Sequence, residues 1–171
     1  EKVVCQIIKA FRGDVEMVYC SPDSDIVRQM LAEQDVTFLP MKEMSTAELK
    51  RVIAEQKPDL IHAHDMRASF FSALCCGKIP LVSHIHNNAY DARGLSPKTV
   101  AYLLAGFKAK HILWVSNSSY EGYAFHKLFA QKSSVLYNII DTEVIFDKKA
   151  QDENTYDYDM IYVGRLTFQK D

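Results

Sequence analysis

Four of the six histidines in this chain stand in two H-x-H pairs, each at the end of a short apolar run. The first pair is His62 and His64, and the second is His84 and His86. An imidazole ring can donate a hydrogen bond, accept one or bind a metal ion. The spacing therefore indicates either a hydrogen-bonding site or a metal centre.

A metal centre is the alternative that these residues raise first. Two H-x-H pairs together with Asp65 could hold zinc or a pair of metal ions, as in a metal-dependent hydrolase. A hydrolase barrel of that kind needs about 250 residues. The chain has 171 and carries a polar stretch and a new strand where more barrel is required. We therefore keep the metal-dependent hydrolase only as the less favoured alternative.

Position in the strands separates the four histidines. Residues two apart on a strand face the same side, and ligands of open parallel sheets bind beyond the carboxyl ends of the strands. We expect His64 and His86 to leave the sheet and face a cleft. His62 and His84 lie inside their strands, where we expect hydrogen-bonded packing residues.

A second group of candidate residues lies near the end of the chain. Gly164 follows an apolar run, and Arg165 and Lys170 come after it. A glycine lets the backbone approach a ligand, arginine offers a planar fork for phosphate oxygens, and lysine adds a mobile charge. The spacing alone also suits an exposed loop.

Short apolar runs alternate with stretches of helical period along the whole chain. We predict strands at residues 15–20, 36–39, 59–63, 80–86, 111–116, 134–137 and 159–163. We predict helices at residues 3–11, 25–33, 68–76, 97–108 and 120–129, and one that Ser45 opens, with Ser24 and Ser45 as N-caps and Glu48 completing a capping box. Strands separated by single helices imply right-handed crossovers and a parallel sheet. The fold class is thus α/β, a doubly wound Rossmann-like sheet.

The edges of the chain predict its domain organisation. No strand precedes the helix at 3–11, although the first strand of such a sheet is usually central. We expect a gap between the strands at Val15 and Asp59, and a protein of these residues alone that is unstable, oligomeric or strand-swapped. Residues 1–146 form the first domain, incomplete at its start, 147–158 a linker, and 159–171 the opening of a second Rossmann-like domain.

Composition excludes several classes of protein. A hydrophobic content of 48% supports a core, and a net charge of −2 gives no sign of a nucleic-acid partner. No apolar run reaches the ~18 residues of a membrane span. The four cysteines show no C-x-x-C spacing, so we expect reduced thiols and a cytoplasmic location.

The order of these segments resembles the GT-B glycosyltransferases of family 4. Five stretches carry the resemblance: D-L-I-H-A-H-D at 59–65, P-L-V-S-H-I-H at 80–86, I-L-W-V-S at 112–116, V-L-Y-N-I-I-D at 135–141, and Y-V-G-R-L at 162–166 with Lys170. The fourth departs from the family pattern, with Ile139 where the family usually has glycine.

The resemblance implies a retaining transferase that moves a sugar from a nucleotide-sugar donor to a glycan or lipid-linked acceptor, in synthesis of bacterial cell-surface polysaccharide. It implies that His86 lies near the transferred sugar, and that Arg165 and Lys170, with Gly164, hold the donor diphosphate. Cations then stabilise the charge of the leaving group, so neither metal nor cofactor is expected. The residues implied on the acceptor side are His64, Asp65, Asn87, Asn88, Ser116 and Asn138.

Other interpretations stay open beside this one. The family's carboxylate pair lies beyond Asp171, so we expect these residues alone to be inactive. A GT-B nucleotide-sugar 2-epimerase shares the architecture, and a degenerate domain that only binds partners is the non-enzymatic alternative. The helix at 97–110 carries Val100, Leu103, Leu104 and Phe107 among lysines. That stripe either packs on the sheet or touches the inner face of the membrane.

Overall fold

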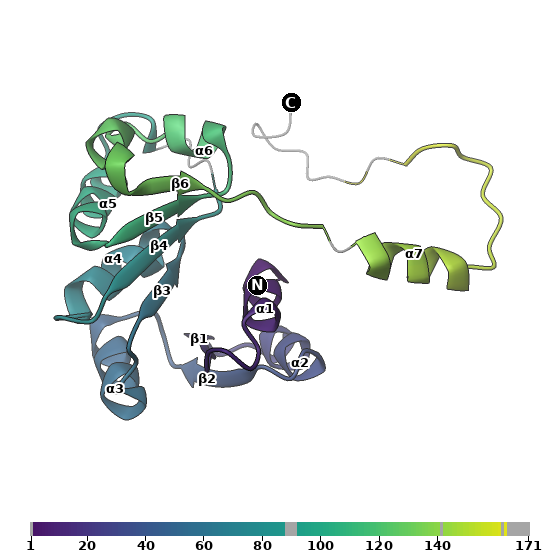
Figure 1. Ribbon diagram of the computed structural model, residues 1–171, viewed down its shortest axis with the longest axis horizontal. Helices are drawn as coiled ribbons and strands as arrows, with labels where there is room; N and C mark the ends of the chain where they lie inside the picture. Colours follow the sequence, from purple (N-terminus) through teal and green to yellow (C-terminus); the bar gives the residue numbers. More distant parts are fainter. Residues whose placement is uncertain (1, 88–91, 141, 162, 164–171) are drawn as a thin grey trace. The chain divides into compact units, whose positions relative to one another are not determined.

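The structure is a computed structural model that describes residues 2–87, 92–140, 142–161 and 163 (Figure 1). It divides into two compact units, residues 1–138 and 139–171, which are described separately below. The strands are β1 Val18–Pro22, β2 Thr37–Met41, β3 Ile61–His64, β4 Leu81–Ile85, β5 His111–Trp114 and β6 Ser133–Val135. The helices of the first unit are α1 Lys2–Ala10, α2 Asp25–Glu33, α3 Thr46–Gln56, α4 Asp65–Cys75, α5 Pro97–Lys108, α6 Asn117–Glu121 and the 3₁₀ helix η2 His126–Lys132.

Among the described residues, the strands form two parallel sheets. One has the order β1-β2 and the other the order β3-β4-β5-β6. Each strand of the larger sheet is parallel to the next in the chain, with Ile61 opposite Leu81 and Val82 opposite His111. This arrangement confirms the α/β, Rossmann-like fold expected from the alternating pattern.

The strands on either side of the expected gap belong to different sheets. β1 pairs with β2, whereas β3 is hydrogen-bonded to β4. The expected break between the strands at Val15 and Asp59 is therefore present in the described part of the chain. How a protein of these residues alone behaves in solution stays a prediction.

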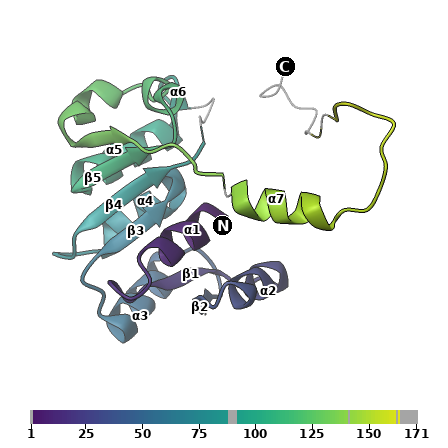
Figure 2. The same cartoon turned by 45° about the vertical axis from the view of Figure 1, so that its right-hand side comes forward.

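One face of the larger sheet is covered by α4 and α5, which pack against each other and against β4 (Figures 1 and 2). Alternate strand residues, among them Ile85, Ile112 and Trp114, are buried beneath these helices. Tyr102 of α5 meets the Trp114 ring edge to face. Because side chains alternate along a strand, His62, His64 and His84 lie on the opposite face. A smaller core of Cys5, Ile8, Leu31 and Val36 joins α1 and α2.

Serine side chains cap the starts of α3 and α5. The Ser45 hydroxyl accepts a hydrogen bond from the Glu48 backbone N–H, as expected, and Ser96 caps α5 through the Thr99 N–H. The capping box is only half formed, because the Glu48 carboxylate accepts from the N–H of Lys42 and not from Ser45. Ser24 is the N-cap of α2, but its side chain makes no capping bond.

The prediction of a single helix at 120–129 is wrong. The chain forms α6 and then η2, with Gly122 closing the first. Tyr123 and Phe129 are each only 1% exposed. Six residues apart on an α-helix they would point about 120° apart. The break lets both rings reach the same core.

The second unit differs from the expected linker and strand. Its helix α7, Thr142–Gln151, takes up the first residues of the predicted linker, and the units divide after Asn138. Residues 159–161 and 163 form no strand. Met160 and Ile161 are 88% and 81% exposed, so nothing described pairs with them or covers them. A stable strand needs a neighbouring strand to pair with and a layer that covers its apolar face. The assignment of 159–171 to a second domain stays a prediction.

None of the four cysteines, which all lie in the described part of the chain, forms a disulfide. Cys5 and Cys76 are buried, whereas Cys20 and Cys75 are partly exposed. Of the described helices, none combines the length and the apolar character that a membrane crossing requires.

Candidate active site

The parallel register of β3 and β4 brings the two H-x-H pairs together. His64 lies opposite His84 across the ladder, and His86 follows Ile85, the last residue of β4. The ring centroids of neighbouring histidines are 4.1–5.5 Å apart. Two motifs separated in the sequence therefore form one cluster of four imidazoles at the carboxyl end of the sheet.

One hydrogen bond joins the two histidines at the strand ends. Nδ1 of His64 lies 2.7 Å from Nε2 of His86. The two ring planes differ by 9°, and the centroids are 5.0 Å apart. That separation is close to the nitrogen–nitrogen distance plus two ring radii, so the rings meet edge to edge. The bond therefore runs nearly in the plane of both rings, which is its favourable geometry.

The inner histidines are packed but not hydrogen-bonded. His84 is 1% exposed, and neither of its ring nitrogens has a partner in the described part of the chain. Nε2 of His62 is also buried without one. The expectation of hydrogen-bonded packing residues is wrong for these atoms, because the sheet has already engaged the backbone groups around them. An unsatisfied buried polar group costs about 1–3 kcal/mol.

Burial keeps the cluster neutral. Desolvation, followed by the charge of neighbouring histidines, lowers the pKa of His62 to about 4, of His84 to about 3 and of His64 to about 2. Desolvation also lowers the pKa of His86, partly offset by Asp65, which favours its charged form. At neutral pH each ring therefore offers one N–H donor and one acceptor nitrogen.

Asp65 anchors the turn that carries His86. One carboxylate oxygen accepts the backbone N–H of His86 at 3.0 Å, and the other accepts from the Asn87 side chain at 3.4 Å. Asp65 begins α4 with a left-handed φ of 70°. Its carbonyl accepts the Ser69 hydroxyl at 2.8 Å. Sequence reasoning placed Asp65 beside the acceptor, whereas its carboxylate is engaged inside the protein.

The histidines also supply a candidate metal group. Ligand nitrogens of His62, His64 and His84 lie within 4.8 Å of one another. Nitrogens bound to one tetrahedral zinc ion at about 2.0–2.1 Å lie roughly 3.4 Å apart. His64 also already uses Nδ1 in its bond to His86. The donor set suits zinc, but the rings would have to turn to bind an ion.

Comparison with known families identifies the fold that holds this cluster. The sequence matches Glycosyltransferase Family 4 over residues 14–144, which is most of the chain and includes all four histidines. The chain belongs to glycosyltransferase family 4. The family resemblance is thereby confirmed, with four of the five sequence stretches inside the matched residues and the fifth, at 162–166, beyond them.

Three solved structures of similar fold are complexes of Anabaena Alr3699/HepE. The Anabaena HepE complex with UDP superposes with a TM-score of 0.70 at 17% identity, covering 88% of this chain and 45% of HepE. The HepE complex with UDP and glucose gives 0.69 at 18%, covering 84% and 41%. The complex with UDP-glucose gives 0.70 at 18%, covering 88% and 45%. The chain thus spans less than half of HepE. Comparison with curated proteins gives no match.

The other predicted site residues of this family 4 domain lie in different surroundings. Asn87 is exposed and bonds Asp65, and Ser116 caps α6 by accepting the Ser119 N–H, a structural task. Asn138 is exposed after β6. The structure brings His64, Asp65, His86 and Asn87 together. Outside the described residues lie Asn88, Gly164, Arg165 and Lys170.

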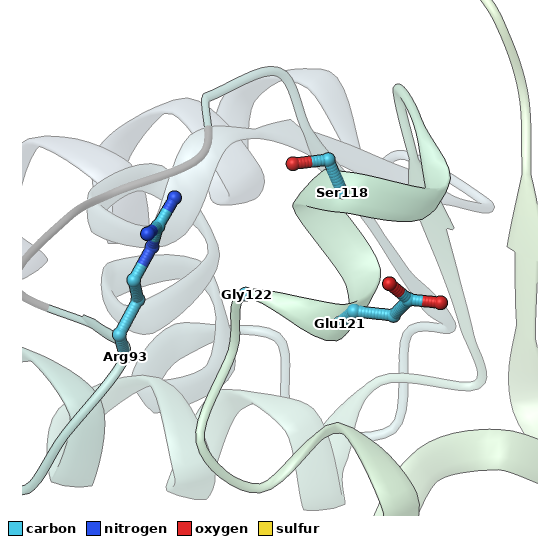
Figure 3. A pocket seen from close by; sticks show the side chains of 4 residues that line it. All are labelled: Arg93, Ser118, Glu121 and Gly122. Carbon is cyan, nitrogen blue, oxygen red and sulfur yellow. The ribbon is translucent and has the colours of Figure 1, made fainter.

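An open hollow of about 350 Å³ was not anticipated from the sequence. Arg93, from the segment between β4 and α5, lines it together with Ser118, Glu121 and Gly122 of the α6 region (Figure 3). Both contributing segments follow the carboxyl ends of strands, where open parallel sheets bind ligands. Arg93 stands in no recognisable motif, so only the topology could have indicated it.

Proposed function

We propose that the protein transfers a sugar from a nucleotide-sugar donor to a glycan or lipid-linked acceptor, with retention of configuration. The family match over residues 14–144 is the observation that carries this proposal. The likeness to HepE complexes with UDP and UDP-glucose supports a uridine nucleotide as the first donor to test.

His86 is the proposed catalytic residue. Its Nε2 is engaged by His64, which leaves Nδ1 for the substrate. A neutral imidazole there donates a hydrogen bond to a sugar hydroxyl or to the departing phosphate oxygen. Such a bond strengthens as negative charge develops on the oxygen, which accelerates the reaction.

The donor diphosphate is assigned by proposal to Arg165 and Lys170, with Gly164 allowing a close backbone approach. The guanidinium fork matches two phosphate oxygens, and the ammonium adds charge. On the acceptor side, Asn87 and the hollow beside Arg93 are the polar groups that follow the strand ends. The acceptor itself is proposed to belong to bacterial surface polysaccharide, assembled at the cytoplasmic side of the membrane.

The direct experiment incubates the full-length protein with a panel of nucleotide sugars, beginning with UDP-glucose, and measures release of the nucleotide. Turnover that requires an added glycan or lipid-linked acceptor supports the transferase. Release of nucleotide with an epimerised free sugar and no acceptor supports the 2-epimerase. Absence of turnover with every donor contradicts both.

A metal-dependent hydrolase is the second candidate, favoured by the grouping of His62, His64 and His84. The transferase as proposed uses cationic side chains in place of a metal ion. We therefore expect activity to persist in excess EDTA. Abolition by EDTA and restoration by zinc favours the hydrolase.

A further inference from the structure

The bond between the two strand-end histidines has a consequence for catalysis. His86 has two ring nitrogens, and the described residues engage only one of them, Nε2, through His64. The ring of His86 is half-buried, so its other nitrogen, Nδ1, is the one left to meet a ligand. Whatever His86 offers a substrate is therefore offered through Nδ1.

The backbone of His86 is held independently of its ring. Asp65 accepts the His86 N–H, and Ser69 fixes the Asp65 carbonyl. The Ser69 hydroxyl lies 2.7 Å from that of Ser83, which in turn lies 2.9 Å from the hydroxyl of buried Tyr102. This chain of polar contacts ties the turn to the core between α4, β4 and α5. Because the main chain is fixed by Asp65, the contact with His64 chiefly sets the rotation and the tautomer of the His86 ring.

The tautomer decides which chemistry Nδ1 can perform. A neutral imidazole carries one proton, on either nitrogen. If Nδ1–H of His64 donates to Nε2 of His86, the proton of His86 stands on Nδ1, which then donates to the substrate. In the reverse arrangement, Nδ1 of His86 is only an acceptor. The state of His64 therefore selects between a donor and an acceptor at the site.

We propose that His64 is a positioning residue, whose Nδ1–H donates to Nε2 of His86 and holds His86 in the tautomer that presents Nδ1–H to the sugar or the leaving phosphate. This assignment rests on the proposed transferase function. It gives the first H-x-H pair a task of its own, because the ladder places His64 beside the end of β4.

Two variants of the full-length protein test the assignment. His64→Phe keeps a planar ring and removes the donor. His64→Asn retains a side-chain amide that can donate from near the position of Nδ1. We expect His64→Phe to lower kcat about 10- to 100-fold, as for loss of a group that orients a functional residue, with KM for the nucleotide sugar within about twofold. We expect His64→Asn to recover most of that loss.

The pairing itself is tested in a double variant. Because His64 acts through His86, adding His64→Phe to His86→Ala should cause no further loss of kcat. Multiplicative losses contradict the proposal. So does unchanged kcat in His64→Phe, or failure of His64→Asn to recover activity when both variants melt at the wild-type temperature.

A second readout does not depend on turnover. In the ¹⁵N spectrum of the histidine rings of full-length protein, with His86→Ala used for assignment, His86 should show its proton on Nδ1 in the wild type and a mixture of tautomers in His64→Phe. The same spectrum in both proteins, or a wild-type proton on Nε2, overturns the proposal. If no nucleotide sugar is turned over, the transferase proposal fails while this measurement still decides the role of His64.

Discussion

At the scale of single residues, the sequence predicted which histidines stand at the strand ends but not how they touch. The H-x-H spacing placed His64 and His86 at strand ends, where they do meet. The bonded nitrogens could not be predicted, because they depend on the register of β3 against β4 and on side-chain rotamers. The anchoring role of Asp65 was missed for the same reason, since it requires His86 and Asn87 to lie beside the first residue of α4.

A substitution of His84 tests whether its two buried ring nitrogens lack hydrogen-bond partners. Replacing it by leucine removes two buried polar atoms without partners and keeps most of the packing. We expect His84→Leu to leave the stability at pH 7.5 unchanged or to raise it, in contrast to a typical core substitution. Urea unfolding of the full-length protein measures this. A loss above 1 kcal/mol, on the order of one hydrogen bond, indicates that His84 has a partner after all.

The buried His84 ring also predicts how the stability of the protein depends on pH. The pKa of His84 falls to about 3 in the folded protein, below its value of about 6.5 when unfolded. The unfolded chain then binds more protons, so the stability contributed by neutral His84 is full above pH 6.5 and is lost as the pH falls towards 3. The loss is at most about 1.4 kcal/mol per pH unit.

We therefore expect His84→Leu to lose less stability than the wild type between pH 7 and pH 4. The matched control is His111→Leu on β5, which removes a histidine that lies within hydrogen-bonding distance of Ser134. Parallel acid profiles for wild type and His84→Leu would contradict the proposed neutral state of the buried ring.

At the scale of helices and strands, local signals predicted the elements whose ends have a chemical marker. The bounds of α2 and α5 agree with the prediction at both ends, and Ser45 and Ser96 cap as their type suggests. The helix after β5 could not be predicted as two pieces, because its break depends on Tyr123 and Phe129 sharing one core. Helical period alone carries no information on that contact.

Close packing between α5 and η2 yields a prediction about Gly106. A Cβ at Gly106 would overlap the ring of Phe129, which is buried. On an exposed helix, Gly→Ala stabilises by up to about 1 kcal/mol. Here we expect Gly106→Ala to destabilise by about 1–3 kcal/mol through overpacking.

Thermal and urea unfolding measure the effect of Gly106→Ala. In the Phe129→Leu background, where the ring is gone, the penalty of the alanine should shrink or change sign, giving a coupling energy between the two sites. Equal effects of Gly106→Ala in both backgrounds would show that the two residues do not touch.

The apolar stripe of α5 is only partly used by the core. Thr99, Tyr102 and Ala105 are buried, whereas Val100, Leu104 and Phe107 are 49%, 57% and 62% exposed. Packing on the sheet therefore explains only the buried part of this stripe. Apolar side chains near Lys98 and Lys108 suit an anionic lipid surface.

We expect the full-length protein to co-sediment with vesicles that contain anionic phospholipid and less with neutral ones, since lysine contributes about 1 kcal/mol near such a surface. Val100→Ser with Leu104→Ser should reduce binding. Leu74→Ser on α4, which is 53% exposed, is the matched control. Equal binding by all three proteins, or no binding to either vesicle, contradicts a membrane role for this face.

At the scale of the whole molecule, the family match and the proposed donor-binding residues fall on different parts of the chain. The match over residues 14–144 covers the histidine cluster, while Arg165 and Lys170 lie outside the described residues. The sequence predicted a parallel sheet because the alternation of its strands with helices is a local signal. It could not predict the state of residues 159–161 and 163, where the exposed apolar side chains of Met160, Ile161 and Val163 find no described partner.

The most direct test of the account is the turnover number of His86→Ala in the full-length protein, measured beside wild type with the nucleotide sugar that it uses. Losing one preorganised hydrogen-bond donor lowers kcat on the order of 10²–10³-fold. Because Arg165 and Lys170 are proposed to hold the donor diphosphate, the dissociation constant of the nucleotide sugar should change little in His86→Ala. Arg165→Ala, by comparison, should lower kcat and also weaken binding of the donor. A kcat for His86→Ala within about threefold of wild type, well short of that loss, would show that the cluster at the ends of β3 and β4 is not the site of sugar transfer.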